Sequence, residues 1–297
     1  MNIFSTGVLA RVIEALPMPA PFILNSFFRD EQTETSEEIH FDVDTGKPRI
    51  SPFVSPLLPG KIVESRGYRT DTFKPAYVKD KRAFDPARPL KRAIGERIGG
   101  NLSPEQRIQA LLASDLADQL EMLTRRQEVM AVEAMRTGKI TVTGEGYPTT
   151  VVDFDRHADL TKALTGGERW GETGVSPLAN VQDWSLQVTQ HSGAAANTVV
   201  MDLKAWKLFH ADPAVQKLLD RFRGKDQLNP TVTGAGGRYM GSTGDFDIWV
   251  YAGWYVDPAT GNLTPYLPDH TVIVSGPDLE GARAYGAIRD EEAGYQA

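Results

Sequence analysis

The chain has 297 residues, of which 41% are hydrophobic and 24% charged, an ordinary composition for one large folded domain or two smaller ones. It contains no cysteine, which excludes disulfides, thiolate nucleophiles and cysteine metal sites. No stretch approaches the roughly 20 apolar residues that span a bilayer, and the N-terminus lacks a secretory signal pattern, so we expect a cytoplasmic protein without membrane contact.

The net charge of −7 is unevenly distributed along the chain. Residues 49–92 hold eleven Lys or Arg against four acids, whereas residues 1–48 hold three bases and eight acids. The basic segment is therefore net +7 and the N-terminal segment net −5, which leaves −9 for the remainder. A basic segment in an acidic chain meets either an external polyanion or the acidic surface of another copy.

The first 48 residues are predicted to be an irregular arm. Three prolines between residues 17 and 21 end any helix begun near the N-terminus, and residues 30–38 are polar and acidic. Only the apolar run 23–28 is expected to pack on other residues.

Residues 49–92 are predicted to be extended. Regularly spaced prolines exclude a helix, and the short alternating runs 62–63 and 73–78 indicate a long two-stranded excursion. Such an excursion buries little surface by itself and would be unusual within a compact domain. We therefore expect it to pack on another chain.

Residues 103–137 are predicted to form a long helix. Ser103 is a favourable N-cap, Pro104 suits the first helical position, and Gln106 completes a capping box. Gly138 is a suitable residue to end the helix. Apolar residues recur on one helical face: Ile108, Leu112, Leu116, Leu120, Leu123, Met130 and Ala134. At about 1.5 Å per residue the helix would span roughly 50 Å.

Beyond this helix the pattern is mixed α/β. Short apolar runs predict strands, capped periodic segments predict helices, and a glycine-rich stretch predicts a loop. The expected strands are 139–143, 151–155, 198–201, 247–256 and 271–274, the helices 177–190, 204–210 and 213–222, and the loop 224–244.

One group of residues could bind a metal. Asp153, Asp155 and His157 alternate, so on a strand their side chains would share one face and could hold a divalent ion in a hydrolase. The alternative is an ordinary solvated strand face, which we favour because no second histidine cluster accompanies them. We therefore expect no metal and no cofactor.

Other catalytic patterns are absent from the sequence. The glycines of 234–244 fit neither dinucleotide-binding nor P-loop spacing, and the segment lies between a helix and a strand rather than the reverse. Ser192 and Ser242 lack the G-x-S-x-G pattern of a nucleophile elbow. The five histidines are scattered, so we expect no enzyme.

Aromatic residues lie between the charges of the basic segment 49–92. Phosphate contacts combined with base stacking are how single-stranded nucleic acids are bound, so such a binder is one alternative. The proline spacing and the overall acidity argue against it. In the later run 247–256, aromatic residues alternate between strand faces, which indicates core packing and a subunit contact.

Several stretches resemble the major capsid proteins of lambda-like tailed phages. VSPLLPGKIVESRGYRTDTFKPAYVKDK (54–81) resembles the family pattern VSP…G..I.SRG…F.P.YVK.K. Further similar stretches occur in family order: FFRD (27–30), GKITVTGEGY (138–147), DLKAWKLFHADPAVQKLLDRFRG (202–224), YMGSTGDFDIWVYAGWYV (239–256), YLPDHTVIVSG (266–276) and RAYGAIRD (283–290).

This resemblance implies the Hong Kong 97 capsid fold, of class α+β. It implies a structural subunit that assembles into hexamers and pentamers of an icosahedral, DNA-packaging head. The implied parts are an N-terminal arm (1–48), an extended loop (49–92), a peripheral domain (93–147 and 269–297) with a spine helix (103–137), and an axial domain (148–268).

The resemblance also implies binding partners and cellular locations. These are other copies of the chain, the portal, scaffolding or protease and decoration proteins, and packaged DNA contacted without sequence preference. The protein would be in the host cytoplasm before assembly and in the virion afterwards. Residues expected at the subunit interface are Arg66, Arg69, Lys74, Tyr77, Lys79 and Lys81. Family chains usually continue past the equivalent of Asp290 with strands that complete the peripheral sheet, which we expect to be missing here.

Overall fold

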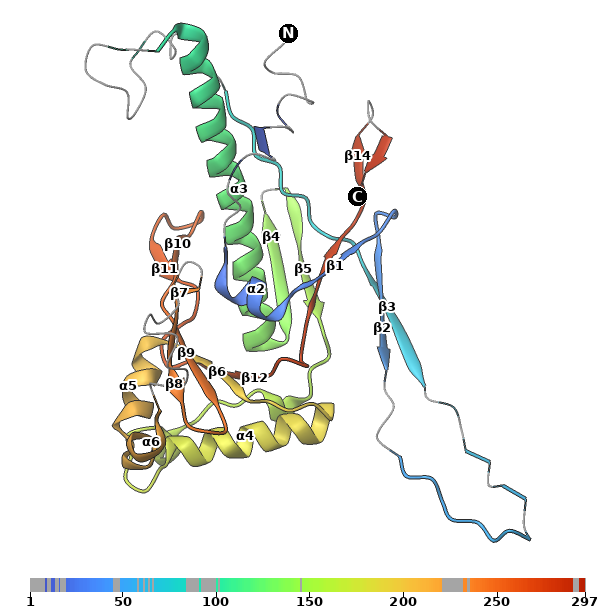
Figure 1. Ribbon diagram of the computed structural model, residues 1–297. Helices are drawn as coiled ribbons and strands as arrows, with labels where there is room; N and C mark the ends of the chain where they lie inside the picture. Colours follow the sequence, from blue (N-terminus) through green and yellow to red (C-terminus); the bar gives the residue numbers. More distant parts are fainter. Residues whose placement is uncertain are drawn as a thin grey trace. The chain divides into compact units, whose positions relative to one another are not determined.

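Helices and strands occur together along the chain, which confirms the predicted α+β class (Figure 1). The computed structural model describes residues 9, 12–13, 16, 20–44, 49–57, 59–60, 62–63, 65, 67–83, 91, 100, 102–144, 146–220, 232–233, 236–290 and 294–296. The chain divides into two units. The larger unit combines residues 1–29 with 78–281, and the smaller unit combines 30–77 with 282–297.

A five-stranded sheet forms the centre of the larger unit. β6 and β9 run parallel, and the other neighbouring pairs are antiparallel. Because successive residues of a strand point to opposite faces, such a sheet can bury side chains on both sides. The strand order is β12 (Val272–Ser275), β6 (Thr198–Met201), β9 (Asp247–Tyr251), β8 (Gly237–Ser242) and β7 (Val232–Thr233).

Three helices cover one face of this sheet (Figure 1). Val199 and Met201 of β6 and Ile248 and Val250 of β9 pack against them, around the fully buried Phe209. This face therefore buries the alternate residues of both central strands. The three helices are α4 (Pro177–Ser192), α5 (Leu203–Ala211) and α6 (Pro213–Leu218).

The opposite face packs against α2 (Phe22–Phe27) and α3 (Pro104–Thr137). Val200 of β6 and Tyr251 of β9, which point away from the first face, join a core with α2 and with the C-terminal half of α3. Phe22 contacts the ring of Tyr251 at 5.3 Å between centroids. The sheet is thus the middle of three layers, and the apolar run predicted to pack does so.

One buried carboxylate joins these elements. Glu128 of α3 is only 1% exposed and accepts hydrogen bonds from the backbone N–H groups of Ile23 and Leu24, each at 2.8 Å. The hydroxyl of Tyr251 donates a third bond at 2.7 Å. Because two of these donors are unpaired N–H groups of the first turn of α2, Glu128 fixes that short helix on α3.

The long helix α3 begins and ends where the sequence predicts. Ser103 accepts a hydrogen bond from the backbone N–H of Gln106, and the Gln106 side chain accepts one from Ser103 N–H. Gly138 ends the helix in the left-handed conformation, with φ of 71°. An antiparallel hairpin of β4 (Lys139–Gly144) and β5 (Tyr147–Asp153) follows.

Among its described residues, the smaller unit contains three pairs of strands. β1 pairs in parallel with β13, β2 pairs antiparallel with β3, and β14 pairs antiparallel with β15. Backbone bonds from Glu34 N–H to Tyr285 O and from Ala287 N–H to Ser36 O continue the contact between these segments beyond the paired residues of β1 and β13. The bounds are β1 (Asp30–Thr33), β2 (Ile39–Asp44), β3 (Tyr68–Phe73), β13 (Ala282–Tyr285), β14 (Ile288–Asp290) and β15 (Gly294–Gln296).

Two predictions for the N-terminal third need correction. The region expected to be irregular contains α2, β1 and β2, because tertiary partners stabilise segments whose local patterns are weak. The two-stranded arm exists, but its paired strands are β2 and β3 rather than the runs 62–63 and 73–78. Residues 39–44, assigned to the arm preceding the loop, thus form one side of its base.

Three predictions for the later part are also wrong in detail. The described residues of the expected loop 224–244 include β7 and β8, where glycine permits close packing. The run 247–256 is two strands, because the chain turns at residues 252–253 before β10 (Trp254–Val256), which pairs with β11 (Leu263–Pro265). Helix α6 ends four residues before the predicted residue 222, although 221–222 lie outside the described residues.

Candidate assembly surface

The extended segment between β2 and β3 exposes large apolar side chains. Ile50, Phe53, Leu57 and Ile62 are each more than nine-tenths exposed. Isolated apolar residues on a surface are ordinary, but four nearly fully exposed ones within 13 residues are not, and the described residues of this segment form no helix or strand. Within this chain they contribute almost nothing to folding.

Cross-strand contacts hold the base of this segment. Phe41 of β2 contacts Phe73 of β3 edge-on, with ring centroids 6.0 Å apart. His40 and Thr72 lie 2.8 Å apart between Nδ1 and Oγ1. His40 and Thr72 are directly opposed and Phe41 and Phe73 are diagonal neighbours, and both kinds of cross-strand contact stabilise an antiparallel pair. The exposed apolar residues therefore extend from an ordered pair of strands.

Basic residues predicted for the interface lie at and beyond this base. Arg69 forms an ion pair with Asp71 at 2.6 Å, and Lys74 forms one with Glu37 at 2.8 Å, both within the smaller unit. Part of the predicted charge is thus already balanced within the chain. Tyr77 is 42% exposed, Lys79 and Lys81 are also exposed, and Arg66 lies outside the described residues.

Arg82 holds the end of the basic segment on the larger unit. Its guanidinium pairs with Asp115 at 3.1 Å and with Asp118, both on α3. These carboxylates raise the pKa of Arg82, the Asp118 hydrogen bond having the largest effect. The amide of Gln119 also donates to the carbonyl of Asp80 at 3.5 Å.

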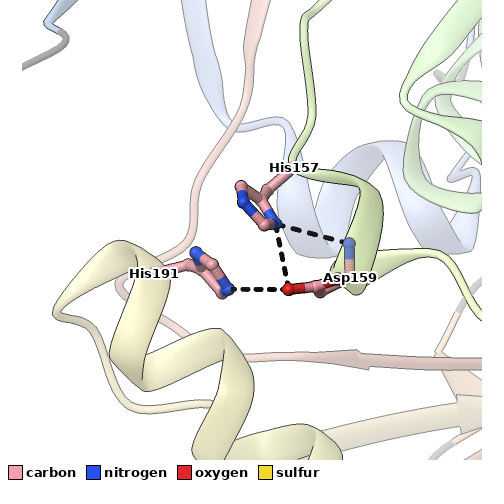
Figure 2. Close-up of side chains that lie close together, drawn as sticks. All are labelled: His157, Asp159 and His191. Atoms are coloured by element: carbon pink, nitrogen blue, oxygen red, sulfur yellow. Dashed lines mark hydrogen bonds and ion pairs between the residues drawn. The ribbon is translucent and has the colours of Figure 1, made fainter.

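Asp153, Asp155 and His157, the group considered as an alternative metal site, do not share one strand face. β5 ends at Asp153, whose carboxylate pairs with Lys139 at 2.6 Å, and Asp155 adopts a φ of 53° that breaks the alternation. His157 instead caps a 3-10 helix, η2 (Ala158–Leu160). There it lies beside Asp159 and His191, a grouping that spacing along the sequence did not indicate (Figure 2).

The glycine-rich and serine positions have structural roles. A Cβ at Gly237 would lie 2.3 Å from the ring of Phe22, so the glycine allows α2 to approach β8. Ser242 is fully buried in β8, and Ser192 donates to the carbonyl of Val188 in α4 at 2.7 Å.

Aromatic residues of 247–256 divide between core and surface. Tyr251 is buried, and its pKa is raised by burial and by the neighbouring carboxylate of Glu128. Burial also raises the pKa of Tyr266, which stacks on Tyr251, to about 12. Trp254 remains 53% exposed. Core packing therefore accounts for part of this run, as the alternation predicted.

A cavity of about 720 Å³ lies in the larger unit. Trp170, Trp184 and Leu164 supply apolar lining, and Asp159 and His270 supply polar lining. Among the helices in the described parts of the chain, none is long and apolar enough to cross a membrane.

Comparison with known proteins gives one consistent result. The family model of the phage major capsid protein E matches residues 5–297. The major capsid protein of Escherichia phage lambda is 30% identical over 296 residues, covering 99% of this chain and 86% of that protein. The major capsid protein of Enterobacteria phage phi80 is 30% identical over 300 residues, with the same coverage.

A solved structure shares the fold. A prophage capsid protein of Escherichia coli CFT073 superposes with a TM-score of 0.76 at 23% sequence identity, covering 98% of this chain and 85% of that one. The comparisons give no support to a single-stranded nucleic-acid binder. That alternative is weakened further by the ion pairs that occupy Arg69 and Lys74.

Proposed function

Since this chain belongs to the phage major capsid protein E family and is a structural protein of the phage capsid, we propose that its copies form the hexamers and pentamers of an icosahedral, DNA-packaging head. The proposed fold is that of Hong Kong 97. On this proposal the chain carries no active site, and its function is to contact other copies of itself.

The observation that carries this proposal is the exposure of Ile50, Phe53, Leu57 and Ile62. Full burial of each side chain on a neighbouring copy would contribute about 1.5–3 kcal/mol. Four such residues would contribute roughly 6–12 kcal/mol, against an association cost of about 4–15 kcal/mol. One loop alone would hold two copies only weakly, so a stable shell requires several contacts per chain.

The basic residues of the segment and Tyr77 would also take part in the contact between subunits. We propose that Arg66, Arg69, Lys74, Tyr77, Lys79 and Lys81 lie at the subunit interface, where positive charge meets the acidic remainder of a neighbour. The ion pairs of Arg69 and Lys74 within the chain would also stiffen the base from which the apolar residues extend.

The remaining parts are assigned by the same proposal. Residues 1–48 would be the N-terminal arm, 49–92 the extended loop, 93–147 and 269–297 the peripheral domain, and 148–268 the axial domain. Portal, scaffolding or protease and decoration proteins would bind the assembled shell, and packaged DNA would contact its inner surface. Before assembly the chain would be in the host cytoplasm.

The test compares two variants in the extended loop. The double substitution Phe53→Ser and Leu57→Ser removes apolar surface that is exposed in the single chain, so thermal unfolding of the monomer should not change. Gly60→Ala is the matched control, because an added Cβ there meets no atom within 4 Å.

Analytical ultracentrifugation measures the outcome. We expect the wild type and the Gly60→Ala variant to sediment as large oligomers, and the double variant as smaller species. An unchanged distribution in the double variant would contradict the proposed role of the loop.

A further inference from the structure

Two histidines and one carboxylate converge on the surface of the larger unit. His157 and Asp159 lie at the start of η2, and His191 lies in the last turn of α4, more than 30 residues later in the chain. One oxygen of Asp159, Oδ2, is 3.5 Å from His157 Nδ1 and 3.9 Å from His191 Nε2 (Figure 2). The two imidazole rings are 4.0 Å apart between centroids.

These distances are close to those of a metal site. Bonds of about 2.0–2.1 Å in tetrahedral geometry place neighbouring ligand atoms roughly 3.3 Å apart. The two separations from Asp159 exceed this value by about 0.2 and 0.6 Å, and all three ligand atoms lie within 4.8 Å of one another, so binding needs side-chain shifts of at most about 1.5 Å. All three side chains are at least about one-third exposed, so they can make such shifts without repacking a core.

Lone pairs of His157 and Asp159 face the same region between these side chains. The backbone N–H of Asp159 donates to His157 Nδ1 at 3.3 Å, so this nitrogen is an acceptor in the structure. Its lone pair and the carboxylate of Asp159 face the same region, an arrangement that a shared cation would stabilise. The 3.3 Å bond is long for an N–H donor, so exchanging it for a metal bond costs little.

We propose that His157, Asp159 and His191 bind one divalent transition-metal ion, such as Zn²⁺, with water completing its coordination. Two imidazoles and one carboxylate suit zinc, cobalt, nickel or copper, whereas magnesium and calcium require more oxygen ligands than this group offers. The cation would also lie at the C-terminal end of α4, where positive charge is favourable.

The bound ion would link two segments of the larger unit. Residues 157–159 follow the β4–β5 hairpin, and His191 ends the helix that covers the central sheet. Metal would therefore raise the melting temperature of the native chain by binding the folded state alone.

Calorimetric titration of zinc sulfate into the metal-free full-length protein at neutral pH tests the proposal. The wild type should bind with single-site stoichiometry, and His157→Ala or His191→Ala should each weaken binding by at least about tenfold to a hundredfold, the loss caused even by second-shell changes. His210→Ala is the matched control, since His210 contacts Trp206 instead, and should leave the affinity unchanged.

Two further readouts sharpen the result. Cobalt should give the intense visible absorption of a tetrahedral site in the wild type and not in the His157→Ala variant, and magnesium should give no binding heat. Absence of zinc binding, or equal affinity in the wild type and the two histidine variants, would overturn the proposal.

Discussion

Replacing Glu128 by alanine should strongly destabilise the larger unit. The carboxylate accepts bonds from Ile23 N–H, Leu24 N–H and the Tyr251 hydroxyl, at 2.7–2.8 Å and away from water. The substitution leaves these three buried donors without their acceptor. Since two of them belong to the first turn of α2, that helix loses its hydrogen bonds to α3 and keeps only its apolar contacts there.

The size of the effect follows from these contacts. Each buried donor left unpaired costs about 1–3 kcal/mol, which gives roughly 3–9 kcal/mol for three. Removing the carboxylate also removes the cost of burying it, so we expect a net loss of about 3–5 kcal/mol, the range for breaking one side of a buried charged interaction. Domains are stable by only about 5–15 kcal/mol, so this loss is large.

Urea unfolding followed by tryptophan fluorescence measures this change. The ring centroids of Trp249 and of Phe22 in α2 are 5.4 Å apart, so the indole senses the loss of α2 packing. Glu121→Ala on the same helix is the matched control, since its exposed pair with Arg125 contributes about 0.5 kcal/mol or less. A free energy of unfolding for Glu128→Ala within about 1 kcal/mol of the control would refute the reasoning.

Three other substitutions test the fold. Gly237→Ala should lower the free energy of unfolding in urea by about 1–3 kcal/mol, because the added Cβ meets the Phe22 ring. Gly60→Ala is the control and should change it by almost nothing. Equal values for the two variants would contradict this packing. Burial raises the pKa of Glu128, so its contribution to stability is fully present below the ordinary glutamate pKa of about 4.3 and is lost as the pH rises through the raised value. The wild type should therefore gain stability relative to Glu128→Gln as the pH falls through the raised pKa towards about 4.3, and a pH-independent difference would count against the raised pKa. Arg156→Met should lower the free energy of unfolding by about 1.5–3 kcal/mol, because the guanidinium donates to two carbonyls in the last turn of α3. A melting temperature identical to that of the wild type would exclude this role.

Local signals explain what could be predicted from the sequence. The capping box at Ser103 and the left-handed Gly138 act within a few residues, so α3 was predicted with the correct ends. Strand β6 was also predicted correctly, because Val199, Val200 and Met201 form a continuous apolar run buried on both faces.

Tertiary contacts explain what could not be predicted. β8 looks like a loop in the sequence, because the role of Gly237 is visible only when Phe22 packs on it. Glu128 resembles any other polar helix position until α2 covers it. His191 joins His157 only through the path of the chain between them, so alternation along β5 suggested the wrong partners.

The central claim is that this chain assembles with copies of itself into a phage capsid. Electron microscopy of the purified wild-type protein, over a range of concentrations, tests it most directly. We predict rings of five or six subunits, or closed shells, that disappear in the Phe53→Ser, Leu57→Ser double variant. Uniform monomers at every concentration, or identical assemblies in that variant, would contradict the account.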